Sequence, residues 1–315
     1  MPTVTCEATL RATLGEGPAW IGPELAWVDI LAHEVHLFDP TTGSDRAIPV
    51  GQAVGAAVPA VDGSLLLAVR DGFARLDPAS EEVSLIASVE ADLPGNRMND
   101  GKCDSAGRFW AGTMSEPPTP GTGGLYRLEL DGSVTVVLDD VTISNGLGWS
   151  PDDRLFYYID TAESTIDVFD YDGPTGAIAN RRVFARIPPG SGDPDGMAVD
   201  RDGYVWVALW DGWALRRFAP DGTLDRKVRL PVSHVTSCAF GGPDLTRLYI
   251  TTASSNGSEP YSPAVLAGQP LAGSLFGLDA PVPGLPVARA GVQPRSHDPG
   301  SGDQGAPAAP NRPAD

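Results

Sequence analysis

The sequence has little cysteine, a shortage of positive charge and no long apolar run. Its three cysteines (Cys6, Cys103 and Cys238) are an odd number without metal-ligand spacing, which excludes a disulfide framework and favours a reducing compartment. Only 22 Lys and Arg stand against 41 Asp and Glu, and the net charge of −19 repels nucleic acid and anionic lipid. Because no segment resembles a signal peptide or a membrane span, we expect a cytoplasmic protein with neither nucleic acid nor membrane as a partner.

Several catalytic motifs are also missing. There is no Gly-x-Ser-x-Gly elbow, no phosphate-binding glycine loop and no dinucleotide fingerprint. The sequence therefore gives no support for an α/β-hydrolase serine mechanism or for a nucleotide-binding enzyme of these types. Two of the four histidines, His33 and His36, are three residues apart, but they have no third ligand and favour no zinc site. His234 lies near the start of a later segment, and its side chain could either pack in the core or face the axis.

Turn-forming residues are abundant instead. The chain has 37 Gly and 30 Pro, and it contains eleven Asp-Gly or Asn-Gly pairs, which typically connect short strands in hairpins. Four segments share an acid or amide, a following glycine and an apolar stretch: Glu16-Gly17-Pro18-Ala19-Trp20, Asn99-Asp100-Gly101-Lys102-Cys103-Asp104, Asn145-Gly146-Leu147-Gly148-Trp149 and Asp195-Gly196-Met197-Ala198-Val199-Asp200.

Adding weaker copies, similar segments begin near residues 16, 55, 99, 145, 195 and 236. A repeat of about 40 to 50 residues, each with about four short strands, predicts an all-β fold, a six-bladed β-propeller. A two-sheet sandwich is the competing interpretation, but it gives no reason for six similar starts. We expect the propeller to span residues 1–291, with its tryptophans between blades, and residues 292–315 to be a disordered tail rich in Pro and Gly.

A radial arrangement brings equivalent positions to one axis. Carboxylates and amides gathered there would form an all-oxygen site for a hard metal ion. Aligned by their Asx-Gly pairs, Asp100 shares a register with Asn145 and Asp195. A single Asx-Gly pair is more often a turn than a metal ligand. Only the recurrence of such pairs at equivalent segment starts favours a metal site.

The chain resembles the regucalcin (senescence marker protein) and gluconolactonase family over roughly residues 8–291. The resemblance rests on motifs that occur in the same order along the chain: Glu16-Gly17-Pro18, Arg97-Met98-Asn99-Asp100-Gly101-Lys102, Gly107-Arg108-Phe109-Trp110-Ala111-Gly112-Thr113-Met114, Ile143-Ser144-Asn145-Gly146-Leu147, Phe156-Tyr157-Tyr158-Ile159-Asp160, Asn180-Arg181-Arg182, Pro194-Asp195-Gly196-Met197 and Thr236-Ser237-Cys238-Ala239-Phe240-Gly241-Gly242. Members of this family are six-bladed propellers with one divalent metal on the axis.

The resemblance implies that Glu16, Asn145 and Asp195 bind the metal. It places Asn99, rather than Asp100, beside them as a fourth or water-mediated metal contact and as a substrate contact. The expected cofactor is one divalent cation, and oxygen ligands do not distinguish Ca²⁺, Zn²⁺, Mn²⁺, Mg²⁺ and Fe²⁺.

The activity that the resemblance implies is hydrolysis of a sugar lactone to its aldonic acid, with Asp195 as the general base. Arg97 and Asn99 are the expected contacts for the substrate. Glu116 is a further candidate, although the contacting acid in regucalcin stands one position later, where this chain has Pro117.

Two other classes of function stay open at this point. One is a calcium-binding regulatory protein without catalysis, and the other is a hydrolase of phosphotriesters with a similar metal site. Polar groups such as Arg97 and Asn99 suit a polyol and favour the lactonase. The expected partner is therefore a small sugar lactone, and the protein is expected to be a monomer or weak dimer.

Overall fold

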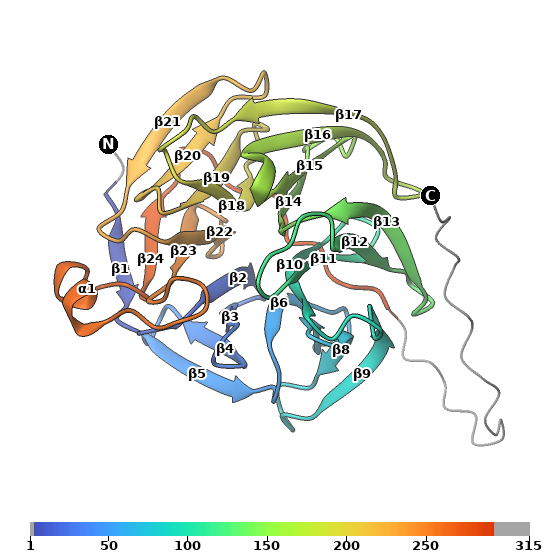
Figure 1. Cartoon of the computed structure of the whole chain (residues 1–315), viewed down its shortest axis with the longest axis horizontal. Helices are drawn as coiled ribbons and strands as arrows, with labels where there is room; N and C mark the ends of the chain where they lie inside the picture. Colours follow the sequence, from blue (N-terminus) through green and yellow to red (C-terminus); the bar gives the residue numbers. More distant parts are fainter. Residues whose placement is uncertain (1–2, 293–315) are drawn as a thin grey trace.

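The computed structural model describes residues 3–292, and these form 24 β-strands with very little helix. The strands make six antiparallel sheets of four strands each, arranged around one central axis (Figure 1). The predicted six-bladed propeller is thereby confirmed. Among residues 3–292 no helix is long and apolar enough to cross a membrane.

The innermost strand of each blade lines the axis. These strands are β2 (Gly15–Trp20), β6 (Val54–Pro59), β10 (Asn96–Cys103), β14 (Ser144–Trp149), β18 (Asp193–Val199) and β22 (Val235–Gly241). Each contains one of the predicted segment starts, so the sequence repeat corresponds to the inner strand of each blade.

The remaining strands follow outward in order. The second strands are β3 (Leu25–Asp29), β7 (Leu65–Val69), β11 (Phe109–Ser115), β15 (Leu155–Asp160), β19 (Val205–Trp210) and β23 (Arg247–Thr252). The third strands are β4 (Glu34–Asp39), β8 (Gly72–Leu76), β12 (Gly123–Leu128), β16 (Thr165–Asp172), β20 (Ala214–Phe218) and β24 (Leu275–Asp279). The outer strands are β5 (Ser44–Pro49), β9 (Val83–Ser88), β13 (Val134–Val141), β17 (Ala177–Arg186), β21 (Leu224–Arg229) and β1 (Thr5–Ala8).

The sixth blade closes the ring with both ends of the chain. β1 is its outer strand and pairs antiparallel with β24, so the first described strand completes the last sheet. The helical segments of the described chain are the short η1 (Thr161–Glu163), between β15 and β16, and α1 (Pro263–Gly268), between β23 and β24.

Aromatic side chains fill the space between blades. Trp20 of β2 stacks on Tyr249 of β23 with ring centroids 6.0 Å apart. Trp149 of β14 meets Trp110 of β11 edge to face at 5.8 Å. Because each pair joins two different blades, the expected placement between blades is confirmed for Trp20 and Trp149.

Two buried carboxylates fix the turns after β10 and β18. Asp200 accepts hydrogen bonds from the backbone N–H of Tyr204 at 3.0 Å, from Trp206 Nε1 at 3.2 Å and from Arg217 Nη2 at 2.6 Å. Asp104 plays the same part for Arg108 and Trp110. These acids are fully satisfied by protein donors and therefore stabilise the fold.

A C-terminal segment, residues 285–289, crosses the far end of the axis. It is attached at Gly284, which bridges to Asp200, and at Ala290, which bridges to Ala60. Val292, assigned to the tail from sequence, is 4% exposed and packs in the core. The rest of the expected tail, residues 293–315, lies outside the described residues.

Candidate metal centre and substrate site

All six inner strands carry an irregularity near their first residues. In β10 the ladder passes from Met98–Thr113 to Gly101–Ala111, so Asn99 and Asp100 together oppose a single residue of β11. Equivalent shifts occur in the other five inner strands. Such β-bulges re-aim side chains and are common next to active sites.

The bulges settle which residues are equivalent. Asn145 is the first bulge residue of β14, Asp195 is that of β18, and Asn99 is that of β10. The alignment by Asx-Gly pairs, which put Asp100 in this register, is therefore wrong. In β14 and β18 the glycine is the second bulge residue, but in β10 Gly101 is the first paired residue after the bulge, so counting back one residue from Gly101 gives Asp100 instead of Asn99.

The glycines at the bulges allow the inner strands to approach one another. A Cβ atom at Gly55 would lie 2.1 Å from the carbonyl oxygen of Asn99, and one at Gly196 would lie 2.0 Å from Ser237 Oγ. The Asp195-Gly196 pair therefore lies inside strand β18, where the glycine allows close contact with the next blade. Asp202-Gly203, by contrast, lies in the connection between β18 and β19, where a hairpin turn is expected.

Glu16 and Asp195 are two buried carboxyl groups facing the same point on the axis. Burial, followed by repulsion from Asp195 and Asp100, raises the pKa of Glu16 well above its ordinary value. Burial and repulsion from Asp100 likewise raise the pKa of Asp195, and hydrogen bonds from Asn145 and Glu16 offset this only in part. A cation between these groups would relieve their repulsion.

Asn145 supplies an unused acceptor beside the two carboxyl groups. Its Nδ2 donates to Thr161 Oγ1 at 3.1 Å, and the Thr161 hydroxyl donates to the carbonyl of Pro194 at 2.9 Å. This leaves Asn145 Oδ1 buried and without a hydrogen-bond partner among the described residues.

Two carboxylates and an orphaned amide oxygen are the donors that a hard divalent cation prefers. Within residues 3–292 no cluster of three or more His, Cys, Asp and Glu side chains is placed to hold a metal. The set Glu16, Asn145 and Asp195 contains only two such residues, because its third member is an amide. These residues fit a hard cation and do not suit a metal that prefers nitrogen or sulfur.

Asn99 is more constrained than Asn145. Its Oδ1 accepts a hydrogen bond from Arg97 Nη1 at 2.7 Å, and its Nδ2 donates to the carbonyl of Ser144 at 2.8 Å. One lone pair of Oδ1 is therefore already used, and only the other is free for a metal or a bridging water.

Arg97 and Glu116 form an ion pair at the same end of the axis. The Arg97 side chain is buried, and its Nε donates to Glu116 Oε1 at 2.7 Å. Arg70, which follows β7, donates from Nη2 to the other oxygen of Glu116 at 2.7 Å. Burial acts to raise the pKa of Glu116, but Arg97 and then Arg70 outweigh it and hold the pKa below its ordinary value.

The structure thus places Glu116, a candidate substrate contact, beside Arg97. Both carboxylate oxygens of Glu116 already accept hydrogen bonds from guanidinium groups, so its direct effect is to orient Arg97. Arg70 was missed from the sequence because Arg70-Asp71-Gly72 has the pattern of an ordinary hairpin turn.

The three histidines of the described chain, His33, His36 and His234, lie outside the candidate metal set. His36 stacks on Trp27 and shares a hydrogen bond of 2.5 Å with Asp45, while His33 sits in the turn before β4. His234 stacks on Trp210 with centroids 3.7 Å apart, and its Nδ1 lies 2.7 Å from the carbonyl of Ser255.

The molecule is thus a β-propeller whose candidate site residues come from different blades and lie near its axis. The chain belongs to the SMP-30/gluconolactonase/LRE-like family, whose profile matches residues 14–254. It is 39% identical to the regucalcin of Gallus gallus over 87% of this chain and 93% of that protein. It is 38% identical, over 86% of this chain and 92% of the relative, to YvrE of Bacillus subtilis, to which sugar lactone lactonase activity is attributed.

Among solved structures, the fold is similar to that of a calcium-binding protein, regucalcin, from Agrobacterium tumefaciens. The TM-score is 0.85 at 30% sequence identity, and the match covers 90% of this chain and 96% of that one. The suspected family is thereby confirmed.

Proposed function

We propose that the protein is a metal-dependent sugar lactone hydrolase that opens an aldonolactone to its aldonic acid. The observation that carries the proposal is the combination, on one axis, of an unpaired oxygen-donor set with a buried guanidinium. The first suits a divalent cation and the second suits an oxygen-rich substrate. The family membership and the lactonase activity attributed to the Bacillus relative support the same chemistry.

Glu16, Asn145 and Asp195 would hold the cation, with Asn99 beside it. When bound there, a divalent cation supplies Lewis-acid polarisation of the lactone carbonyl. Oxygen ligands suit calcium, magnesium and manganese best, and zinc and iron(II) are tested beside them because zinc also accepts carboxylate oxygen.

Asp195 is the proposed general base. Its carboxylate removes a proton from the water whose oxygen attacks the carbonyl carbon, and the ring C–O bond then breaks with the proton going to the leaving ring oxygen. Burial and the negative charge of Asp100 raise the pKa of Asp195, which strengthens it as a base. A bound cation would lower the pKa of Asp195 and thus oppose this effect.

Arg97 and Asn99 are the proposed substrate contacts. Arg97 Nη1 is tied to Asn99, while Arg97 Nη2 has no hydrogen-bond partner among residues 3–292 and is available to a substrate oxygen. Because Glu116 and Arg70 hold the guanidinium in place, little side-chain freedom is lost when a substrate binds.

The test is a pH-stat panel of five- and six-membered aldonolactones and one phosphotriester. Protein from which metal has been removed with a chelator is loaded separately with Ca²⁺, Zn²⁺, Mn²⁺, Mg²⁺ or Fe²⁺, and metal binding is followed by calorimetry. We expect lactone turnover above spontaneous hydrolysis with at least one metal. Arg97→Ala should lower kcat/KM at least about tenfold, as expected for loss of a charged hydrogen bond, while the metal affinity is retained.

Arg182→Ala is a matched control, since Arg182 pairs with Asp170 on the outer part of the fourth blade. It should change neither measurement. Metal binding without turnover of any lactone would support the calcium-binding regulator instead, and turnover of the phosphotriester alone would support that class of hydrolase.

A further inference from the structure

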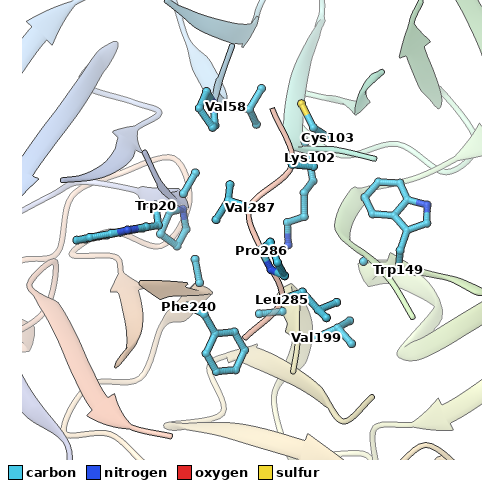
Figure 2. Close-up of a pocket in the computed structure, with 18 of the residues that line it drawn as sticks. Trp20, Val58, Lys102, Cys103, Trp149, Val199, Phe240, Leu285, Pro286 and Val287 are labelled. Carbon is cyan, nitrogen blue, oxygen red and sulfur yellow. The ribbon is translucent and has the colours of Figure 1, made fainter. Parts of the chain in front are cut away.

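The axis also contains a cavity below the candidate metal centre. Its volume is about 460 Å³, and it is lined by the later residues of the inner strands and by the C-terminal segment 285–289 (Figure 2). Glu16, Asn99, Asn145 and Asp195 do not line it. A cavity of this size lies in the range that small organic ligands occupy in proteins.

The walls of the cavity are mainly apolar. Figure 2 shows large side chains around its centre that come from different blades and from the C-terminal segment: Trp20, Val58, Trp149, Val199, Phe240, Leu285, Pro286 and Val287. Aromatic and aliphatic walls of this kind favour a flat apolar molecule.

Two polar groups distinguish the cavity from a simple apolar void. The Lys102 side chain extends into it toward Pro286 (Figure 2), and Nζ donates one of its three protons to the carbonyl of Met197 at 2.6 Å. Asp100 also lines the cavity; it is 5% exposed, and its Oδ2 has no hydrogen-bond partner among residues 3–292. The cavity therefore offers free donors on Lys102, beside the buried carboxyl group of Asp100.

The charges of the lining indicate the class of ligand. Lys102 and Asp100 carry opposite charges, and the third charged residue, Asp153, accepts a hydrogen bond of 2.6 Å from Ser105 at the rim. A charged ligand would therefore meet one attractive group and one repulsive group inside. An uncharged ligand with a hydrogen-bond acceptor would bind Lys102 without being repelled by Asp100.

The C-terminal segment provides a route into the cavity. Its ends are fixed by the backbone hydrogen bonds of Gly284 to Leu245 and of Ala290 to Pro59. Within the described part of the chain, residues 285–289 form no backbone hydrogen bond between these anchors. The middle of the segment can therefore move aside without breaking a sheet.

We propose that this cavity is a second ligand site, for a small uncharged aromatic molecule bearing a carbonyl acceptor. The carbonyl oxygen accepts a hydrogen bond from Lys102 Nζ, and the ring lies between Trp20, Trp149 and Phe240. The site is separate from the proposed lactone site and does not depend on the proposed reaction.

The test measures binding of four matched probes to the full chain by calorimetry and by quenching of tryptophan fluorescence. The probes are 2-naphthamide, the anion 2-naphthoate, the cation 2-naphthylmethylamine, and naphthalene. We expect 2-naphthamide to bind with one-to-one stoichiometry and at least about tenfold more tightly than the other three.

Two kinds of variant locate the binding. Lys102→Met should weaken 2-naphthamide about tenfold or more, and Val287→Trp, which fills the cavity from the C-terminal segment, should abolish its binding. Arg97→Ala, at the other end of the axis, is the matched control and should leave the affinity unchanged. If Val287→Trp does not fold, Val58→Phe fills the same space from β6.

Several results would overturn the proposal. These are the absence of saturable binding, binding that survives a folded cavity-filling variant, and tighter binding of either charged probe than of the amide. Loss of binding in Arg97→Ala would assign the probe to the upper site and would also overturn it. Lactone turnover is measured separately, so failure of this proposal is distinguishable from failure of the proposed function.

Discussion

The two ends of the propeller axis are built by the same six strands but have opposite chemistry. At the upper end, where the inner strands begin, bulges bring together buried acids and amides such as Glu16, Asn145 and Asp195. At the lower end, the later residues of the same strands are largely apolar and line a cavity with a single lysine.

The difference shows how one strand serves two purposes along its length. Burial, and then repulsion from Asp100, raises the pKa of both Glu16 and Asp195 at the upper end, and a bound cation would offset this effect. Apolar groups at the lower end need no such cation. The position of a residue along its inner strand therefore decides whether it takes part in binding charge or in enclosing an apolar space.

The largest expected effect comes from removing an acid at the upper end. Asp195→Ala should lose the metal and lower kcat/KM at least about 10³-fold, as expected when a general base is removed. Lactone turnover and calorimetric metal titration measure the two losses. The exposed Asp193, two residues earlier in β18, is the control, and Asp193→Ala should retain both functions. Full metal stoichiometry in Asp195→Ala would contradict the site.

The next largest effect tests a buried acid that has all its partners. Asp200→Ala should destabilise the protein by about 3–5 kcal/mol, because it leaves the buried Arg217 guanidinium without its partner. Urea unfolding measures this loss, and metal binding by the folded fraction should be unchanged. Asp221→Ala, in an exposed turn, is the control. Loss of metal without loss of stability in Asp200→Ala would show that the division of roles between these acids is wrong.

Much of the fold could be predicted because its signals are local and repeated. The six inner strands, the hairpin turns between strands and the positions of Trp20 and Trp149 between blades all follow from short segments that recur along the chain. The register of Asn99 did not follow from the repeat, because a bulge adds a residue and an Asx-Gly pair does not reveal where the bulge begins.

The surroundings of the site residues were less predictable. Glu116 was expected near the substrate, but its two bonds to Arg97 and Arg70 join three residues of different segments. Lys102 had no pattern that would place it in a cavity. Such contacts depend on how blades meet, and no local motif records that.

A moderate effect should come from Arg70, which touches the site only through Glu116. Arg70→Ala should lower kcat/KM about three- to tenfold, mainly through KM, because Arg97 then loses part of its support. Arg70→Lys should restore much of the loss, and the metal affinity should be unchanged in both variants. If KM stays constant while kcat falls, Arg70 does not position a substrate contact.

The smallest expected effect concerns His234, which packs beside Trp210 at the start of the sixth inner strand. Burial lowers the pKa of His234, and its hydrogen bond to the Ser255 carbonyl opposes this only in part. The folded protein therefore binds a proton at this site less readily than the unfolded chain does. The stability from this group is complete above the unfolded pKa of about 6.5 and is lost as the pH falls through the folded value.

His234→Gln removes the titrating group at this position and keeps a polar side chain of similar reach. We expect the fall in Tm between pH 7 and pH 5 to be smaller in this variant than in the wild type. Since His234 does not belong to the proposed metal set, the metal affinity at pH 7 should be unchanged. An equal fall in Tm for His234→Gln and the wild type would show that this histidine does not couple protonation to folding.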